Sequence, residues 1–326
     1  MKRKWNGLAI ALGVVSVASI GACNAASSDY PTRPIRLVIP FSSGGGTDTL
    51  ARLIAARMTE TWGRQTVVDS RPGGNGVIGM EIVARANPDG HTLVLAYIAN
   101  LGTAPAMNRK LPYDAKRDFA PISHIVNAPS IVVLHPGVQA KSFQDLILQN
   151  RGKPGVAFGT AGVGSIGHLV GEMVNRAAGV SFQHIAYKGG GQGVVDVLSG
   201  HIPMAILGMA PVAAHIRAGR LRAVAVTGGT RSAAFADVPT IAEQGFPGIV
   251  AEAWYGFAAP AGTPRAIIAK VHGEVTRIIA LPEVRERLAN LGFEPVGSTP
   301  EQFADLIAKE IVRWTQVIRD AGIASE

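Results

Sequence analysis

Residues 35–48 read Ile35-Arg36-Leu37-Val38-Ile39-Pro40-Phe41-Ser42-Ser43-Gly44-Gly45-Gly46-Thr47-Asp48. An apolar run leads into a glycine-rich segment, and a helical pattern follows at residues 49–61. This order predicts a buried strand, a tight turn and a helix. Glycine lets successive backbone N–H groups converge on one anionic group, and the N-terminus of a helix carries about half a positive charge. The stretch therefore predicts an anion-binding turn.

A second glycine-rich turn lies far downstream. The apolar residues 156–158 precede Gly159-Thr160-Ala161-Gly162-Val163-Gly164-Ser165, and a helical pattern follows at residues 166–177. Two donor loops in two halves of the chain predict a cleft between them.

Length and composition fit two lobes. The chain has 326 residues, of which 47% are hydrophobic. A chain of this length is too large for a single ordinary hydrophobic core. The formal charge is +8, and the first 25 residues contribute three basic and no acidic residues, which leaves +5 for the rest. The basic residues are scattered rather than clustered, so no nucleic-acid partner is expected. The mild excess serves either solubility or the collection of small anions.

The first residues predict export. Residues 1–25 combine a basic start with an apolar run at residues 8–20 and small residues after it, which is typical of a signal peptide. The run is shorter than the roughly 20 residues that a spanning helix needs. The single cysteine, Cys23, ends Ile20-Gly21-Ala22-Cys23, which resembles a lipoprotein processing site. Acylation of Cys23 and ordinary cleavage near Ala25 or Ala26 are two alternatives, and both predict a periplasmic protein.

Strand-like and helix-like segments alternate through the chain, which predicts an α/β protein whose parallel sheets are covered by helices. The predicted strands are residues 35–39, 66–69, 92–96, 131–134, 155–158, 182–185, 204–207 and 223–227. The predicted helices are residues 49–61, 78–86, 143–149, 166–177, 193–199, 211–218, 264–280, 282–291 and 300–320.

The predicted lobes are joined by two crossings. One crossing lies near residues 126–130 and the other near residues 249–255, so the first lobe comprises residues 30–127 and 251–326, and the second comprises residues 128–250. Two crossings form a hinge that can close over a ligand.

Five ordered motifs together carry a resemblance to a known family. They are Pro40-Phe41-x-x-Gly44-Gly45-x-x-Asp48, Arg71-Pro72-Gly73-Gly74-Asn75-Gly76, Leu111-Pro112-Tyr113-Asp114 with Asp118-Phe119-Ala120-Pro121, Tyr187-Lys188-Gly189-Gly190, and Ala259-Pro260-Ala261-Gly262-Thr263-Pro264. From about residue 30 onward the chain resembles the Bug family, the TctC-type receptors of tripartite tricarboxylate transporters.

The resemblance implies a type II periplasmic binding-protein fold, with two lobes that close on a small organic carboxylate and deliver it to inner-membrane transporter subunits. It implies a monomer without cofactor and without catalysis. In the family, two glycine-rich loops grip the carboxylate from opposite lobes, and the turn at residues 187–191 adds a third helix N-terminus. The positions that match these loops and this turn are Phe41, Ser42, Ser43, Gly44, Gly45, Thr47, Asp48, Thr160, Gly162, Gly164, Ser165, Tyr187, Lys188, Gly189 and Gly190.

Two other loops depart from the family pattern. Tyr97-Ile98-Ala99-Asn100-Leu101 stands where many relatives have small polar residues, and Gly208-Met209-Ala210 is poor in hydrogen-bonding side chains. With Tyr97, Asn100 and Met209 included in the predicted site, these loops favour a ligand with an apolar or aromatic body. A core position for Tyr97 and Met209 is the alternative.

Individual polar residues in these loops have competing interpretations. Asp48 is expected to accept backbone N–H bonds that hold its turn, because a free carboxylate would repel an anionic ligand. Lys188 either pairs with a carboxylate or points to solvent. Trp254 and Tyr255, at the second predicted crossing, either wall the cleft or pack the hinge.

Other chemistries have weaker support in the sequence. Residues 162–167 match a dinucleotide-binding pattern, but no carboxylate lies in residues 183–188, where a ribose-binding acid belongs. The segment around Ser165 lacks the first glycine of a nucleophile elbow, so it does not predict a hydrolase. The histidines do not have the spacing of metal ligands, so no metal is expected. A ligand sensor for a membrane signalling protein and a secreted enzyme on the same scaffold stay as alternatives to the transport receptor.

Overall fold

The computed structural model describes residues 29–107, 110–320 and 322–323. The unit Pro31–Glu326 is compact, and it contains all the strands and helices considered below. The predicted signal peptide and Cys23 lie outside the described residues.

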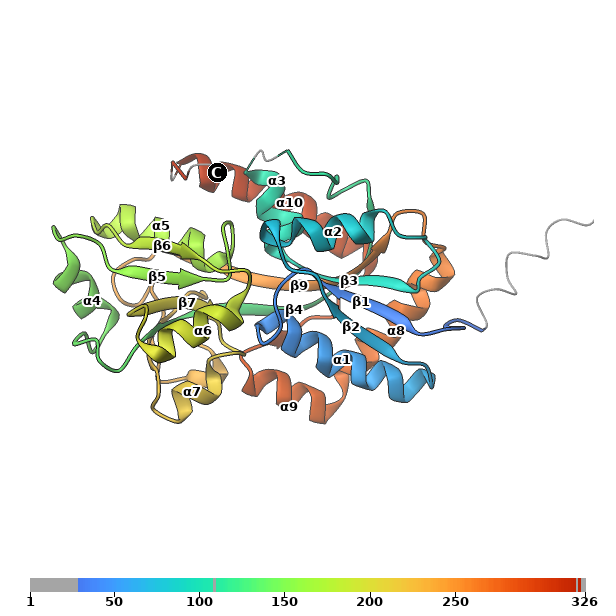
Figure 1. The fold of residues 1–326 in the computed structure, drawn as a ribbon, viewed down its shortest axis with the longest axis horizontal. Helices are drawn as coiled ribbons and strands as arrows, with labels where there is room; N and C mark the ends of the chain where they lie inside the picture. The colour runs from blue at the N-terminus through green and yellow to red at the C-terminus, as the bar shows by residue number, and fades with distance from the viewer. Residues whose placement is uncertain (1–28, 108–109, 321, 324–326) are drawn as a thin grey trace, which may run out of the picture. The chain divides into compact units, whose positions relative to one another are not determined.

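The first group of strands is parallel and is built around β1. In this group β1 lies between β2 and β3 (Figure 1). The elements of this group are β1 (Ile35–Ile39), α1 (Gly46–Trp62), β2 (Thr66–Ser70), α2 (Val77–Ala84) and β3 (Thr92–Tyr97).

The second group repeats this arrangement further along the chain. Here β5 lies between β6 and β7, again in parallel. The elements are α4 (Phe143–Asn150), β5 (Ala157–Thr160), α5 (Ile166–Ala178), β6 (Gln183–Ala186), α6 (Gly190–Ser199), β7 (Met204–Gly208), α7 (Ala213–Arg217) and β8 (Arg222–Val226).

Two long antiparallel strands, β4 (Phe119–Leu134) and β9 (Glu252–Pro260), connect the groups (Figure 1). β9 pairs with β3 and with the first part of β4, up to Pro129. From Ser130 onward, β4 pairs instead with β7 and β8. The result is the two-lobed α/β fold predicted from the sequence. We propose that the lobes divide where β4 changes partners, which is close to the predicted boundary after residue 127.

The C-terminal part returns to the first lobe. Its contacts include those of α8 with α1 and β4, and those of α10 with β4. The elements are α8 (Arg265–Ala280), α9 (Pro282–Asn290), β10 (Glu294–Pro295) and α10 (Pro300–Asp320), and shorter turns of helix occur at η2 (Gly74–Gly76), η3 (Ala99–Thr103), α3 (Ala104–Ala106) and η4 (Ala233–Phe235).

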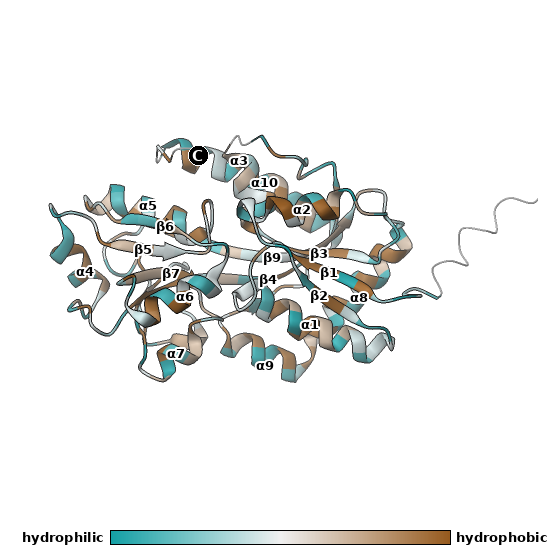
Figure 2. Ribbon diagram, in the orientation of Figure 1, coloured by the Kyte–Doolittle hydropathy of each residue, from teal (hydrophilic) through white to brown (hydrophobic). Residues whose placement is uncertain are grey.

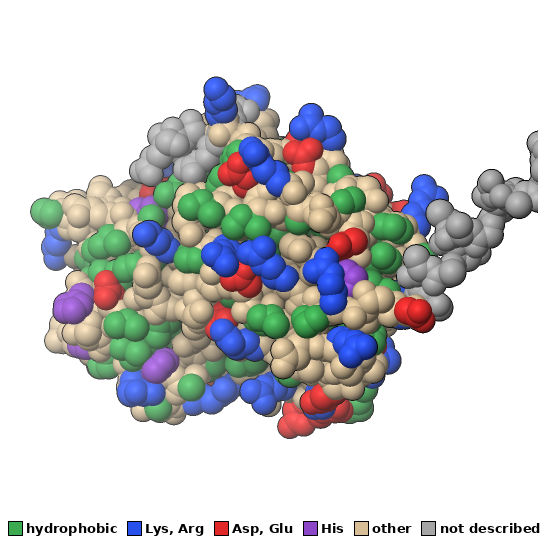
Figure 3. Space-filling view, turned by 45° about the vertical axis from the view of Figure 1, so that its right-hand side comes forward, with side chains coloured by type: hydrophobic (Ala, Val, Ile, Leu, Met, Phe, Trp, Pro, Cys, Tyr) green, Lys and Arg blue, Asp and Glu red, His purple; other side chains and the backbone are tan. Residues whose placement is uncertain are grey.

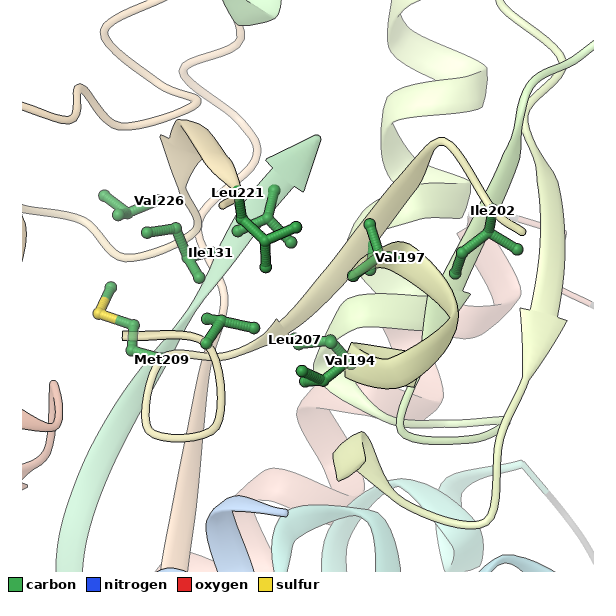
Figure 4. Close-up of a cluster of buried hydrophobic side chains, with 11 residues drawn as sticks. Ile131, Val194, Val197, Ile202, Leu207, Met209, Leu221 and Val226 are labelled. Carbon is green, nitrogen blue, oxygen red and sulfur yellow. The ribbon is translucent and has the colours of Figure 1, made fainter. Parts of the chain in front are cut away.

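Burial explains why these segments form. Strands β1 and β3 are mostly hydrophobic, whereas helices such as α1 and α9 alternate polar and apolar residues (Figure 2). In the second lobe, one cluster packs β4, β7 and β8 against α6 (Figure 4). Its members include Ile131, Val197, Leu207, Met209 and Val226, each at most 2% exposed. Packing of this kind fixes the strand ends from which the glycine-rich turns project.

Candidate functional site

The first predicted turn ends at the N-terminus of α1. Gly45 is the N-cap residue of this helix, and no side chain caps it. Asp48 accepts a hydrogen bond from the Gly44 N–H at 3.0 Å and one from Arg52 Nε at 2.9 Å. Asp48 therefore holds the turn together, as the sequence argument expected, and its charge is compensated by a cation rather than aimed at a ligand.

A second uncapped helix N-terminus faces the first from the other lobe. Gly189 is the N-cap residue of α6, with φ 138°, and it too has no side-chain cap. A methyl group added to Gly45 would lie 3.4 Å from the Gly190 nitrogen, and one added to Gly191 would lie 2.6 Å from the Ser43 oxygen. The two turns thus meet backbone to backbone, and at Gly191 the approach is too close for any side chain.

A small cavity of 30 Å³ lies where these two helix ends meet. It has room for about one or two water molecules, so the cleft is closed and an organic acid needs the lobes to part. Its lining residues are Phe41, Gly45, Gly46, Thr47, Tyr97, Ala161, Gly189, Gly190, Gly208, Pro211 and Tyr255. None of these residues is an acid, a lysine, an arginine or a histidine.

Aromatic rings form the wall of this cavity on the side of the first lobe. Phe41 meets Tyr97 edge to face at 5.6 Å between ring centroids, and Tyr97 lies 5.0 Å from Tyr255. Burial raises the pKa of Tyr97, and this rise is opposed by a hydrogen bond from the Ile166 N–H. Burial and the neighbouring Tyr97 raise the pKa of Tyr255, against a hydrogen bond from Thr47. Both phenols are therefore neutral at physiological pH.

The backbone N–H groups of the predicted loop at residues 159–165 form hydrogen bonds mostly within their own lobe. The Gly162 N–H donates to Thr160 Oγ1 at 3.2 Å, and the Gly164 N–H donates to His168 Nδ1 at 3.1 Å. Ser165 caps α5 by accepting from the His168 N–H. Only Ala161 of this loop lines the cavity. Because these donors already have partners, the α1 and α6 ends are the better anion sites in this conformation.

Two histidines contact this loop from within the second lobe. His168 and His184 stack with ring centroids 4.1 Å apart, and His184 Nε2 lies 2.7 Å from Thr160 Oγ1. Burial lowers the pKa of His184 to about 4, so it is neutral at physiological pH. In its observed contact His168 Nδ1 is an acceptor, which requires that nitrogen to be unprotonated. Ser165 and His168 thus form a helix cap and not a nucleophile with its base.

The remaining predicted residues take structural positions. Buried Asn100 accepts from the Tyr97 N–H at 3.3 Å, and the Tyr187 hydroxyl donates to Asp196 at 2.6 Å. Lys188 is exposed, and its backbone oxygen accepts from the Ser42 N–H at 3.0 Å. Met209 lies in the core cluster of the second lobe, outside the cavity lining, which is the alternative that the sequence left open.

Polar atoms at the closed cleft also include an unsatisfied hydroxyl. Ser42 Oγ is buried without a hydrogen-bond partner, and a methyl group added to Gly189 would lie 2.6 Å from it. Its neighbour Ser43 is exposed. Ser42 is therefore the serine of this loop that faces the other lobe.

Five lining residues were not in the predicted set: Gly46, Ala161, Gly208, Pro211 and Tyr255. Gly46 and Ala161 belong to the predicted loops, and Tyr255 was considered as a cleft wall. The predicted set included Met209 of this loop but not its neighbour Gly208. In the structure the Met209 side chain packs into the core and Gly208 lines the cavity.

Charged side chains do not gather into a single patch on the face shown in Figure 3. Lys and Arg side chains are dispersed over the face seen in Figure 3, with acidic side chains between them. No cluster of three or more potential metal ligands occurs among the described residues. Nor does any helix within residues 29–107, 110–320 and 322–323 have the length and hydropathy needed to span a bilayer.

Known proteins resemble this chain over most of its length. The family model described as "Tripartite tricarboxylate transporter family receptor" matches residues 50–323. The chain belongs to this receptor family. The family and its solved relatives are periplasmic binding proteins and not enzymes.

Relatives of this receptor cover nearly its whole length. Protein BugT of Bordetella pertussis is 37% identical over 311 residues, which is 94% of this chain and 95% of BugT. The structure of Rpa4515 of R. palustris with adipate matches with a TM-score of 0.88 and 34% identity, covering 90% of this chain and 99% of that one. MatC of Rhodopseudomonas palustris with bound malate matches with a TM-score of 0.82 and 30% identity, covering 89% and 100%.

Proposed function

We propose that this protein is a periplasmic receptor that captures a small organic carboxylate between its lobes and delivers it to a tripartite tricarboxylate-type transporter in the inner membrane. One observation carries the proposal. The uncapped N-termini of α1 and α6, from opposite lobes, converge on one cavity. Each end offers unpaired backbone N–H groups and a partial positive charge, so together they suit one anionic group.

The carboxylate class has support from relatives. Rpa4515 is described with adipate and MatC with malate, and both share this fold over their full length. Backbone N–H groups do not change their protonation state with pH, so binding through them tolerates changes of periplasmic pH. They also release the anion when the lobes separate, because each lobe alone provides only one of the two helix ends.

The body of the ligand is proposed to be apolar or aromatic. Phe41, Tyr97, Tyr255 and Pro211 line the cavity, and no charged side chain does. Apolar surface would be buried against these rings at about 25 cal/mol per Å². A second charged group on the ligand would therefore lie outside this wall, toward the turns.

The test is isothermal titration calorimetry of the purified protein. The panel contains malate, adipate, benzoate and hexanoate, with glucose as the comparison that has no carboxylate. We expect carboxylates to bind, and hexanoate or benzoate to bind more tightly than malate. Binding of glucose with no response to any carboxylate would refute the assignment. Delivery is tested by uptake of the bound carboxylate into vesicles that contain the partner membrane subunits, with and without the receptor.

A further inference from the structure

The turn after β2 contains an unusual backbone position. Asn75 has φ 56° and ψ 39°, and it is the one non-glycine with positive φ in the described part of the chain. Gly74 and Gly76 on either side also have positive φ. Asparagine tolerates this left-handed region better than most residues, but glycine adopts it more easily. The turn alone therefore does not explain why a side chain is present here.

That side chain crosses the cleft. Asn75 Nδ2 donates a hydrogen bond to the backbone oxygen of Val163 in the second lobe. The opposite orientation of the amide would place its oxygen against the Val163 oxygen, so repulsion fixes which atom faces the carbonyl. Asn75 is itself held in place, because Asn100 Nδ2 donates to its backbone oxygen at 3.3 Å. Its Oδ1 is buried without a partner.

A second side chain of the first lobe makes the neighbouring contact. Thr103, in η3 and fully buried, donates from Oγ1 to the Gly164 oxygen at 2.6 Å. Two consecutive carbonyls of the second lobe, those of Val163 and Gly164, are thus held by donors from the first lobe. The N–H groups of Gly162 and Gly164 bond within their own lobe. The carbonyls therefore attach this loop to the opposite lobe.

We propose that Asn75, together with Thr103, is a latch that stabilises the closed cleft without contacting the ligand. Neither residue lines the cavity between α1 and α6. When the lobes part, the Val163 and Gly164 carbonyls lose these donors and turn to water. The latch therefore contributes to the closed state whichever ligand is bound, whereas the helix ends determine which ligand binds. The role of the latch in ligand release rests on the proposed function, but closure itself does not.

Closure is measured first in buffer that contains no carboxylate. Spin labels on Arg85→Cys and Val195→Cys, in a Cys23→Ser background, report the distance between the lobes by double electron–electron resonance. Arg85 and Val195 are exposed and lie on different lobes. The variants are Asn75→Gly, which keeps the turn and removes the amide, and Asn75→Asp, which keeps the shape and replaces the donor by an acceptor. Thr103→Val removes the hydroxyl, whereas Thr103→Ser retains it. Asn87→Gly, at an exposed position of the same lobe, is the control.

The latch predicts a definite order of closed populations. Asn75→Gly and Thr103→Val shift the equilibrium toward the open form by about two- to tenfold, the range expected for one hydrogen bond. Asn75→Asp shifts it further, because a carboxylate then faces a carbonyl oxygen. Thr103→Ser and Asn87→Gly match the parent. A side chain that merely shaped the turn would instead leave Asn75→Gly at least as closed as the parent. Parent-like closure in both Asn75 variants overturns the proposal.

Dissociation rates of malate and adipate then separate a latch from a ligand contact. A latch accelerates release of both carboxylates by the same factor in Asn75→Gly. Unequal factors would show that Asn75 contacts the ligand and would overturn the proposal. Because the distance measurement needs no ligand, failure of every carboxylate to bind refutes the proposed function and leaves the result for the latch intact.

Discussion

The rings of Tyr97 and Tyr255 lie 5.0 Å apart at an interplanar angle of 40°, yet their hydroxyls form hydrogen bonds to residues of different lobes. The two residues are paired in register between β3 and β9. The Tyr97 hydroxyl accepts from the Ile166 N–H, at the start of α5 in the second lobe. The Tyr255 hydroxyl bonds to Thr47 in α1 of its own lobe. Only the bond of Tyr97 breaks when the lobes separate.

Tyr97→Phe is therefore expected to open the cleft. The variant leaves the Ile166 N–H without its partner, which weakens the closed state by about 1 kcal/mol, or roughly fivefold in the closed-to-open ratio. The same interlobe distance measurement reports this change.

Tyr255→Phe provides the contrast within the same pair of rings. It should lower the free energy of unfolding by about 1 kcal/mol, since Thr47 loses its partner inside one lobe. The closed population should stay unchanged. An opening as large as that of Tyr97→Phe would mean that the two hydroxyls are not divided between the lobes.

Gly191→Ala should weaken carboxylate binding at least tenfold. Gly191 lies in the first turn of α6, a conformation that alanine adopts freely, so the second lobe is expected to tolerate the change. The new methyl group would lie 2.6 Å from the Ser43 oxygen and would hold the two helix ends apart. Calorimetry with the carboxylate panel measures the loss.

The control for this variant is Gly273→Ala, an exposed position inside α8 with open space around it. It should raise the free energy of unfolding by about 0.5–1 kcal/mol, as alanine does in a helix, and leave affinity unchanged. Equal affinity in both variants would argue against an anion site between α1 and α6.

Stability should fall as the medium becomes acidic, in part because of His184. Its pKa is about 4 in the folded protein and 6.5 ordinarily, because burial disfavours the charged form. Between these values the unfolded chain takes up a proton that the folded chain does not, so unfolding becomes easier as pH falls from about 6.5 to 4. Melting temperatures of His184→Gln should depend less on pH over this range than those of the parent.

Gln183, the exposed neighbour of His184 in β6, provides a control that cannot titrate. Gln183→Ala should retain the pH dependence of the parent. If His184→Gln shows the same slope as the parent, the acid sensitivity comes from other groups.

The fold could be predicted where the pattern along the chain is local. β1 and the start of β7 were placed correctly because a short apolar run bounded by turn residues needs no distant partner to be recognised. Strand β4 was predicted only from residue 131, although it begins at Phe119. Pro121 and Pro129 argue against a strand, and the pairing with β9 accommodates Pro121 with an adjacent shift of register. That compensation comes from β9, more than 120 residues away.

The site could be predicted in part for the same reason. Gly45 was predicted because it belongs to a glycine-rich turn between an apolar run and a helical pattern, whereas Gly189 was included through the resemblance to the receptor family. The satisfaction of the Gly164 N–H by His168 Nδ1 was not foreseen, since it depends on the side-chain orientation at the start of α5. Whether these residues contact the ligand stays a prediction that the variants above test.

Ser42→Ala separates the stability of the free protein from its affinity. Ser42 Oγ is buried at the cleft without a partner, and such a group destabilises a folded protein by about 1–3 kcal/mol. Removing it should therefore raise the free energy of unfolding, measured with urea. If the hydroxyl donates to a bound carboxylate, affinity should at the same time fall about tenfold. Ser43→Ala, at an exposed position of the same loop, should change neither quantity. A Ser42→Ala protein that is more stable and binds carboxylates as tightly as the parent would show that this hydroxyl is not a ligand donor, and binding would then rest on the backbone N–H groups alone.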